Sequence, residues 1–408
     1  MTSFPAHLFS EPVGRFQPSG IEEMVAYLKE PGMISFSGGM PAPDTFPVES
    51  FAECAAIIRT EGTTVLQYDN PQGYAPLREF LASWTSPRMG RKISPEEILV
   101  TAGSMQGAHL FALALLNPGE YALIEEPTFM GVTGSMSNHG VRFIGIPCDH
   151  LGIRVDLLEE TVRRGREEGK VIKCLYTIPN FQNPSGRVTS SQRRLDILEL
   201  AKKYDFLILE DDPYRHLYYD APPPGTYLAM QENDGRVIYL GSFSKLIAPG
   251  IRCGWMIAPP ELYKKFHQIR VTNDLNLPTI LHEGIFRFLS DYDFQDHLKT
   301  LRKTYGEKRD GMVEALKRHL APEDFLYELP RGGFFLWGRA PWLHNSMEFA
   351  TFAVTEEKIG LIPGEIFFTS PENYRDTLRL SFAKVSPAAA EEGCARLARA
   401  MERYRRRG

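Results

Sequence analysis

The chain has 408 residues, with 46 lysines and arginines against 51 aspartates and glutamates, so its formal net charge is −5. Apolar residues make up 43% and charged residues 24%, which is typical of a globular protein and excludes a chain that is disordered throughout. The length exceeds the size at which one core stops growing, and the mild negative charge gives no support to a nucleic-acid or membrane-surface partner.

The N-terminus and the cysteines bear on the compartment. Residues 1–7 lack a basic region followed by an apolar run, and no window approaches eighteen uninterrupted apolar residues, so we expect neither a signal peptide nor a transmembrane helix. The five cysteines are scattered and form no Cys-x-x-Cys pair, which is typical of reduced thiols and not of a disulfide framework or zinc site. We therefore expect a cytoplasmic protein with no membrane partner and no metal.

Short β-rich runs alternate with longer helical patterns through the middle of the chain. The predicted strands are Ile98–Thr101, Tyr121–Glu125, Val141–Ile146, Val171–Thr177, Phe206–Glu210, Val237–Gly241 and Cys253–Ala258. The predicted helices between them include Gly107–Leu116, Val155–Glu168 and Ser190–Tyr204. Such alternation is typical of βαβ crossovers, so the sequence predicts an α/β fold whose mostly parallel sheet is covered by helices.

After about Pro278 the pattern changes to that of a smaller α+β domain. Long helical patterns are followed by short strands and an Arg-rich terminal helix, at Thr279–Ser290, Phe294–Leu320, Phe325–Glu328, Phe334–Trp337 and Thr377–Phe382. The residues up to about Pro47, dense in Pro and Gly, are expected to pack with this domain. We predict a large domain over 48–290 and a small domain formed by 1–47 and 291–408.

A lone lysine, Lys245, ends the sequence Leu-Gly-Ser-Phe-Ser-Lys, which begins within the predicted strand Val237–Gly241. A lysine held at the end of a buried strand is desolvated, which lowers the pKa of its amine and makes the amine nucleophilic. A surface lysine on a turn also explains this segment, and from the hexapeptide alone it is the favoured interpretation.

Three acids, Glu210-Asp211-Asp212, end another predicted strand, at the position where open α/β sheets bind ligands. One carboxylate is suited to pair with a cationic ring nitrogen, or the cluster is suited to bind magnesium. The remaining interpretation is a solvated strand end.

Two more segments follow predicted strands. Gly103-Ser104-Met105 opens an apolar helix, where backbone N–H groups and a hydroxyl form a phosphate site or a plain helix cap. Asn183 lies in Asn-Pro-Ser-Gly, a turn sequence whose Asn side chain can also bind a ligand.

Together, these four motifs resemble in order and context the fold-type I pyridoxal-phosphate enzymes, specifically the class I and II aminotransferase family. The resemblance extends from Gly38-Gly39-Met40-Pro41 to Arg379-Leu380-Ser381-Phe382. Within the family, the chain is most similar to the branch of kynurenine, 2-aminoadipate, aromatic and branched-chain aminotransferases. The resemblance implies the cofactor pyridoxal 5′-phosphate and transamination between an α-amino acid and a 2-oxo acid such as 2-oxoglutarate.

The resemblance also implies catalytic roles, position by position. Lys245 matches the Schiff-base lysine that carries the proton between Cα and C4′. Asp211 matches the acid that pairs with the pyridine nitrogen. Tyr214 and Asn183 resemble the pair that hydrogen-bonds the ring's 3′ oxygen.

Binding roles are implied in the same way. The phosphate-binding positions match Ser104, Met105, Ser242, Ser244 and Arg252, although Met105 replaces a polar residue and is expected to contribute only its backbone N–H. Phe129 matches the aromatic that stacks on the ring, and Tyr68 a tyrosine that reaches the phosphate of a neighbouring subunit, which implies a homodimer. Arg379 resembles the clamp for the substrate α-carboxylate, and Gly39 a backbone contact near it.

One departure from the family bears on the substrate. Some members that recognise acidic or large side chains have Ile-Arg where this chain has Ile21-Glu22. A carboxylate at that position repels a distal substrate carboxylate. We therefore expect a neutral, aromatic or branched amino donor in preference to glutamate or 2-aminoadipate.

Three alternatives stay open. A β-lyase, racemase or decarboxylase would use the same cofactor. A regulator with an aminotransferase-like domain would need a winged-helix module, for which the residues before the Gly-Gly motif are too few. A metal-dependent hydrolase built on Asp211 and Asp212 would leave Lys245, Asn183 and Arg379 without a role.

Overall fold

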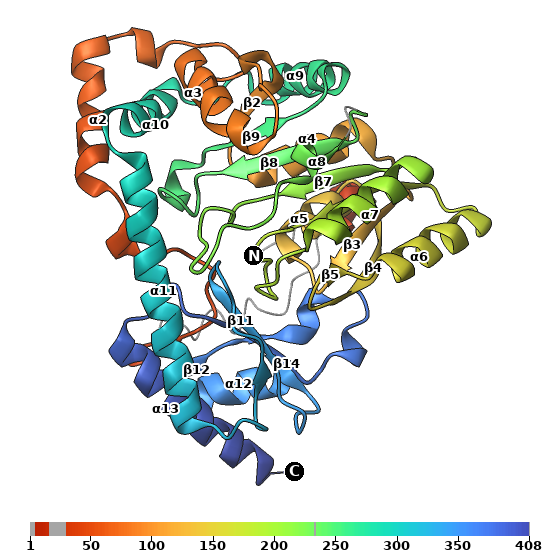
Figure 1. Cartoon of the computed structure of the whole chain (residues 1–408), viewed down its shortest axis with the longest axis vertical. Coiled ribbons are helices and arrows are strands. Elements are labelled where there is room, and N and C mark those ends of the chain that lie inside the picture. The colour runs from red at the N-terminus through yellow and green to blue at the C-terminus, as the bar shows by residue number, and fades with distance from the viewer. Residues whose placement is uncertain (1–4, 16–29, 232–233, 408) are drawn as a thin grey trace.

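The computed structural model describes residues 5–15, 30–231 and 234–407. They form two lobes of unequal size, and helix α11 (Phe294–His319) runs from one lobe to the other (Figure 1). Within those ranges, no helix is both long and apolar enough to cross a membrane.

The larger lobe is built on an eight-stranded sheet of order β2-β9-β8-β7-β6-β3-β4-β5. Its strands are β2 (Ile98–Thr101), β3 (Tyr121–Glu126), β4 (Arg142–Asp149), β5 (Gly152–Ile153), β6 (Ile172–Thr177), β7 (Leu207–Asp211), β8 (Val237–Ser242) and β9 (Gly254–Ile257). Neighbours from β4 through β3, β6 and β7 to β8 pair in parallel. Strand β9 runs antiparallel to β2 and β8, and β5 antiparallel to β4. The predicted mostly parallel sheet is confirmed.

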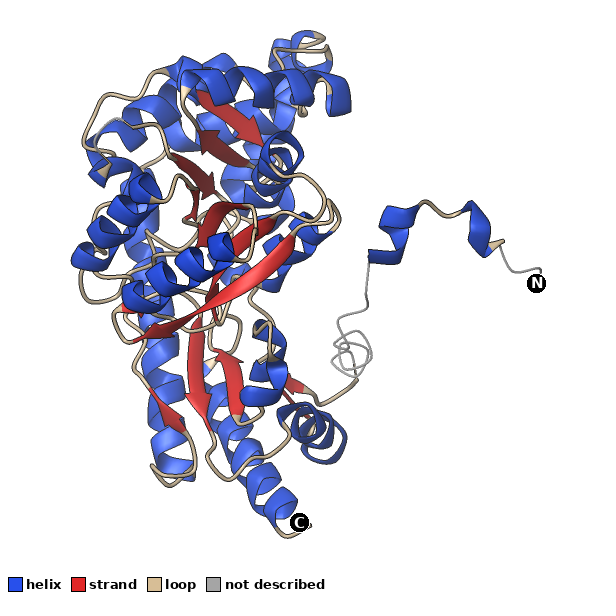
Figure 2. Cartoon of the chain, turned by 90° about the vertical axis from the view of Figure 1, so that its right-hand side faces the viewer, coloured by secondary structure: helices blue, strands red, loops and turns tan. Residues whose placement is uncertain are grey.

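The larger lobe also contains helices, which pack on this sheet or on one another (Figure 2). They are α2 (Val48–Glu61), α3 (Ala75–Thr85), α4 (Ser104–Leu115), α5 (Met130–Ser137), α6 (Val155–Glu167), α7 (Ser191–Lys203), α8 (Tyr227–Met230), α9 (Pro260–Asp274) and α10 (Thr279–Asp291). The central strands are buried along nearly their whole length, and β8 is buried at every residue. Such strands read as continuous apolar runs because both sheet faces are covered.

The smaller lobe contains an antiparallel sheet of order β10-β11-β14-β13. Its strands are β10 (Leu326–Tyr327), β11 (Phe335–Arg339), β13 (Ile362–Pro363) and β14 (Thr377–Ser381). Beside them, β1 (Ile34–Ser35) pairs in parallel with β12 (Ile359–Gly360), and helices α12 (Ser346–Glu357) and α13 (Pro387–Arg405) complete the lobe. Both ends of the chain thus contribute to the smaller lobe.

The residue limits of the two domains stay a prediction. Helix α11 contributes Leu301 and Tyr305 to the larger core but Met312 and Leu316 to the smaller one. Near the N-terminus, Phe36 belongs to the smaller core and Ala42 to the larger. Each of the two connections between the lobes therefore contributes residues to both cores.

Candidate active site

A cavity of about 330 Å³ opens at the carboxyl ends of the parallel strands. Every predicted site residue except Tyr68 lines it. The lining residues are Gly39, Ser104, Met105, Phe129, Ile178, Asn183, Asp211, Pro213, Tyr214, Ser242, Ser244, Lys245, Pro249, Arg252 and Arg379. The cavity therefore combines residues of the large sheet with residues from the two chain ends.

Strand topology explains why residues so distant in sequence meet. Ser104 begins α4 just after β2, Asp211 is the last residue of β7, and Ser242 is the last residue of β8. Asn183 and Lys245 lie in the segments that follow β6 and β8. Parallel strands place their carboxyl ends at one edge of the sheet, where ligands bind in such folds.

The half-buried Lys245 side chain lines the cavity. It donates a hydrogen bond to the carbonyl oxygen of Gly39 at 2.9 Å, across the two lobes. Burial lowers the pKa of Lys245 to about 8, the charges of Arg379 and Arg252 lower it further, and Asp211 opposes them. A large fraction of this amine is therefore neutral and nucleophilic near pH 8.

Asp211 provides the anionic end of the cavity. The Tyr176 hydroxyl donates to its Oδ2 at 3.0 Å, while Oδ1 is buried and has no hydrogen-bond partner. Burial raises the pKa of Asp211 to about 7, although the hydroxyls of Tyr176 and Ser104 lower it. A carboxylate with a free buried oxygen is suited to accept the N–H of a cationic ring, which would compensate its desolvation.

Another part of the cavity lining is suited to an anion. Arg252 has a left-handed backbone with φ of 48°, and its guanidinium donates to the carbonyl oxygens of Ala102 at 2.8 Å and Pro249 at 3.2 Å. A Cβ on Gly103 would lie 2.7 Å from Arg252 Nη2, so glycine leaves room for the guanidinium. The N-terminus of α4 begins at the next residue, and helix N-termini favour phosphate.

Arg379 joins the smaller lobe to the larger one. Its Nη1 donates to Asn183 Oδ1 at 2.8 Å and its Nη2 to the carbonyl oxygen of Ser37 at 2.6 Å. The rings of Phe335 and Phe367 lie 4.5 and 5.0 Å from its guanidinium carbon. Burial lowers the pKa of Arg379 to about 10, so the side chain is still a cation at neutral pH. This fixed cation is suited to bind a carboxylate.

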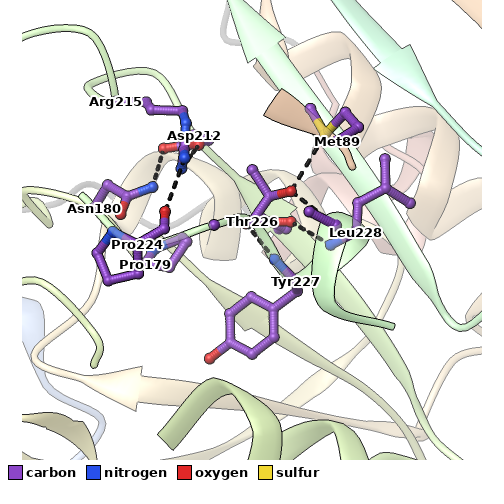
Figure 3. A network of polar contacts seen from close by, with 12 residues as sticks. Met89, Pro179, Asn180, Asp212, Arg215, Pro224, Thr226, Tyr227 and Leu228 are labelled. Carbon is purple, nitrogen blue, oxygen red and sulfur yellow. Dashed lines mark hydrogen bonds and ion pairs between the residues drawn. The ribbon is translucent and has the colours of Figure 1, made fainter. Parts of the chain in front are cut away.

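Asp212, unlike its neighbour Asp211, does not line the cavity. It accepts a hydrogen bond from Asn180 Nδ2 at 2.7 Å, and its Oδ2 lies 3.5 Å from Arg215 Nη1 (Figure 3). Among the described residues, no group of three or more His, Cys, Asp and Glu side chains is arranged to hold a metal ion. The contacts of Asp212 thus disfavour the metal-dependent hydrolase.

Some residues of the site have no clear sequence signal. Ile178, Pro213 and Pro249 line the cavity, and each stands within a few residues of a motif noted above. Tyr176 and Ser37 contact Asp211 and Arg379 only because of how the strands and lobes meet. Proximity to a motif would have identified the first three, whereas the last two required the fold.

One predicted site residue lies outside the cavity, and one residue of the substrate argument is not among those described. The Tyr68 side chain is outside the cavity, and the residue is 76% exposed. Glu22, on which the sequence-based substrate argument depends, lies outside the described residues.

The donor set fits pyridoxal phosphate. The unpartnered oxygen of Asp211 is suited to the protonated pyridine nitrogen, and the Lys245 amine, with its lowered pKa, to the cofactor's aldehyde carbon. The space beside Gly103 and Arg252 suits the phosphate. Each part of the cofactor thus has a complementary group in one cavity.

Comparisons with known proteins agree with this chemistry. The family model described as aminotransferase class I and II matches residues 32–397. The chain is 38% identical to a 2-aminoadipate transaminase of Thermus thermophilus, over 97% of this chain and 96% of the relative. It is 36% identical to aromatic-amino-acid aminotransferase 1 of Thermococcus litoralis, over 96% of this chain and 93% of the relative.

A solved structure extends the comparison to the fold and the cofactor. It is the alpha-aminoadipate aminotransferase of Thermus thermophilus complexed with N-(5′-phosphopyridoxyl)-L-leucine, with a TM-score of 0.87 and 36% identity over 97% of this chain and 98% of that one. The predicted family, fold, reaction and cofactor are confirmed, and the lyase, racemase, decarboxylase and regulator alternatives are not favoured. The chain therefore belongs to the class I and II aminotransferases and is a pyridoxal-phosphate-dependent aminotransferase.

Proposed function

We propose that this enzyme transfers the amino group of neutral α-amino acids, with aromatic or branched side chains favoured, to a 2-oxo acid, and that the cavity around Lys245 is its active site. The observation that carries the proposal is that an amine of lowered pKa, a buried carboxylate and a buried guanidinium line one cavity, namely those of Lys245, Asp211 and Arg379.

Bound pyridoxal phosphate supplies an electron sink for the negative charge that develops at the substrate Cα. In our proposal, Lys245 binds the cofactor and, once freed, removes the Cα proton and returns it at C4′. A pKa of about 8 suits this role because the amine can both accept and release a proton near neutral pH. Asp211 Oδ1 holds the ring nitrogen proton, and Tyr214 and Asn183 bind the ring's 3′ oxygen.

The other cofactor contacts are assigned by position. Phe129, at the start of α5, covers one face of the ring. The start of α4 holds the phosphate through Ser104 and the N–H of Met105. Three further lining residues complete the phosphate site, namely Ser242, Ser244 and Arg252. The Ser244 N–H donates to Ser242 Oγ at 3.1 Å, which orders this segment before the phosphate arrives.

The preference for neutral donors follows from the count of cations. The described residues that line the cavity include three cations, Lys245, Arg252 and Arg379, and the proposal gives each a role. None is left for a second substrate carboxylate, and burying an unpaired carboxylate is costly. Arg379 and the backbone at Gly39 bind the α-carboxylate. One named relative acts on aromatic amino acids and another on 2-aminoadipate, so the substrate panel below decides between them.

We also propose that the enzyme is a homodimer with shared active sites, in which Tyr68 reaches the cofactor phosphate of the partner subunit. A tyrosine that is 76% exposed and outside its own cavity is suited to such a contact. Leu66, two residues before Tyr68, is an apolar side chain that is 65% exposed, which adds to the case for a covered surface. We place the enzyme in the cytoplasm, because the four described cysteines are free thiols.

The test is a spectroscopic titration of the purified enzyme with a panel of amino acids. Phenylalanine or leucine should bleach the yellow absorbance of the cofactor bound to Lys245 and release the matching 2-oxo acid. Lys245→Ala should not form that absorbance. If 2-aminoadipate or glutamate proves the best donor, the cation argument is wrong; if ammonia and pyruvate appear in place of a matched oxo acid, transamination itself is wrong.

A further inference from the structure

Glu126, the last residue of β3, forms a contact between the lobes that the predicted mechanism does not use. Its Oε1 accepts two hydrogen bonds from Thr369, one from the backbone N–H at 2.6 Å and one from Oγ1 at 2.5 Å. Thr369 belongs to the smaller lobe and is 243 residues away in sequence. Glu126 is only 8% exposed, so its carboxylate is largely desolvated and these hydrogen bonds replace its contacts with water.

The neighbouring strand leaves space for this carboxylate. Gly145 lies on β4, and a Cβ added to it would stand 1.9 Å from Glu126 Cδ. No side chain other than glycine is compatible with the observed position of Glu126. Glycine at position 145 therefore leaves room for the carboxylate at the place where Thr369 donates to it.

The segment that Glu126 holds also contacts the substrate arginine. Thr369 follows the short 3-10 helix Gly364–Phe367, and the Phe367 carbonyl accepts a hydrogen bond from the Thr128 N–H at 2.9 Å. The buried Phe367 ring lies 5.0 Å from the guanidinium carbon of Arg379. The β3–α5 loop thus bonds at two points to the segment whose aromatic ring packs on Arg379.

We propose that Glu126 is a positioning residue, which holds the Gly364–Thr369 segment against the larger lobe so that Phe367 keeps Arg379 oriented for the substrate carboxylate. This rests on the proposed role of Arg379. Phe129, two residues after Pro127, lies on the same loop and lines the cavity, so the loop that faces the cofactor also fixes the substrate clamp. The contact acts on substrate binding and leaves cofactor binding unchanged.

The test compares variants at both ends of the contact in the holoenzyme. Glu126→Ala removes the acceptor and should raise KM for the amino donor about tenfold, because both donors of Thr369 lose a hydrogen bond to a charged group. Thr369→Val removes one donor and should raise KM about threefold. Glu126→Gln keeps an acceptor oxygen and should restore KM to within about threefold of wild type. Gly145→Ala should displace the carboxylate and resemble Glu126→Ala.

Binding is measured separately from turnover. The dissociation constant of 3-phenylpropanoate, an unreactive carboxylate, should rise with KM, whereas the dissociation constant of pyridoxal phosphate should stay within about twofold. Glu328→Ala serves as the matched control, because Glu328 also joins the lobes, through Arg187 at 3.3 Å, away from Arg379.

The outcomes separate this proposal from the proposed function. If wild type neither binds the carboxylate nor transaminates, the proposed function fails. If wild type does both but KM is unchanged in Glu126→Ala and Thr369→Val, the role of Glu126 is wrong. An equal loss in Glu328→Ala would indicate general loosening of the lobes and would also overturn it. Should Glu126→Ala fail to fold, Thr369→Val, at the exposed end of the contact, decides.

Discussion

Replacing Asp211 with asparagine should stabilise the cofactor-free protein while weakening its hold on the cofactor. Asp211 is buried, and one of its oxygens has no hydrogen-bond partner. Burial raises the pKa of this carboxyl from 3.8 to about 7. Between these two values, the folded state binds a proton that the unfolded state has released, so this group makes the folded state less stable as pH rises from about 4 to about 7.

The magnitude follows from the same pKa. A pKa of about 7 in place of 3.8 corresponds to about 4 kcal/mol of unfavourable free energy at pH above 7. The asparagine amide is also desolvated, so we expect Asp211→Asn to recover about 1–3 kcal/mol. The gain over wild type should be near zero at pH 4 and complete above pH 7.

The assay is urea unfolding of both cofactor-free proteins at pH 5, 6.5 and 8.5, with a parallel titration of pyridoxal phosphate. Other buried acids, such as Glu125 with a pKa raised to about 8 by burial, also titrate in this range. The informative quantity is therefore the difference between variant and wild type at each pH. A variant that is destabilised equally at every pH, or that binds the cofactor as tightly as wild type, would refute the reasoning.

Three further outcomes are expected. Arg379→Lys should raise KM for the amino donor about tenfold or more with a smaller change in kcat, because an ammonium cannot bind a carboxylate through two parallel hydrogen bonds, and unchanged steady-state kinetics would contradict this. Tyr68→Phe should weaken cofactor binding about tenfold, as measured by equilibrium dialysis, while light scattering shows that the variant is still a dimer. If the enzyme is a monomer that binds the cofactor tightly, Tyr68 is not part of the site. The rate at which cofactor-free protein recombines with pyridoxal phosphate should rise with pH up to about 8 and then level off, because Lys245 reacts as the neutral amine; stopped-flow absorbance measures it, and a flat profile would contradict the lowered pKa.

The sequence by itself predicted most strands of the larger sheet, and its resemblance to the aminotransferase family identified most cavity residues. Strand β2 is predicted at its observed limits, because a strand that is buried at every residue appears as a short apolar run bounded by turn residues. Residues directly after such strands gather at one sheet edge, which made Lys245, Asp211 and Asn183 candidates, and the resemblance to the aminotransferase family then gave each of them a role.

Tertiary structure decided what depends on contacts between distant segments. Asp211 and Asp212 are adjacent and chemically alike, yet one lines the cavity and the other contacts Asn180 and Arg215. The contact between Glu126 and Thr369 joins residues that are 243 positions apart, and the apolar pattern of neither segment predicts it. Patterns of apolar residues report which face of an element is buried, but they do not report which element covers it. The pairing of the lobes, and with it the desolvation that shifts the pKa values of the site, appears only once the chain is folded.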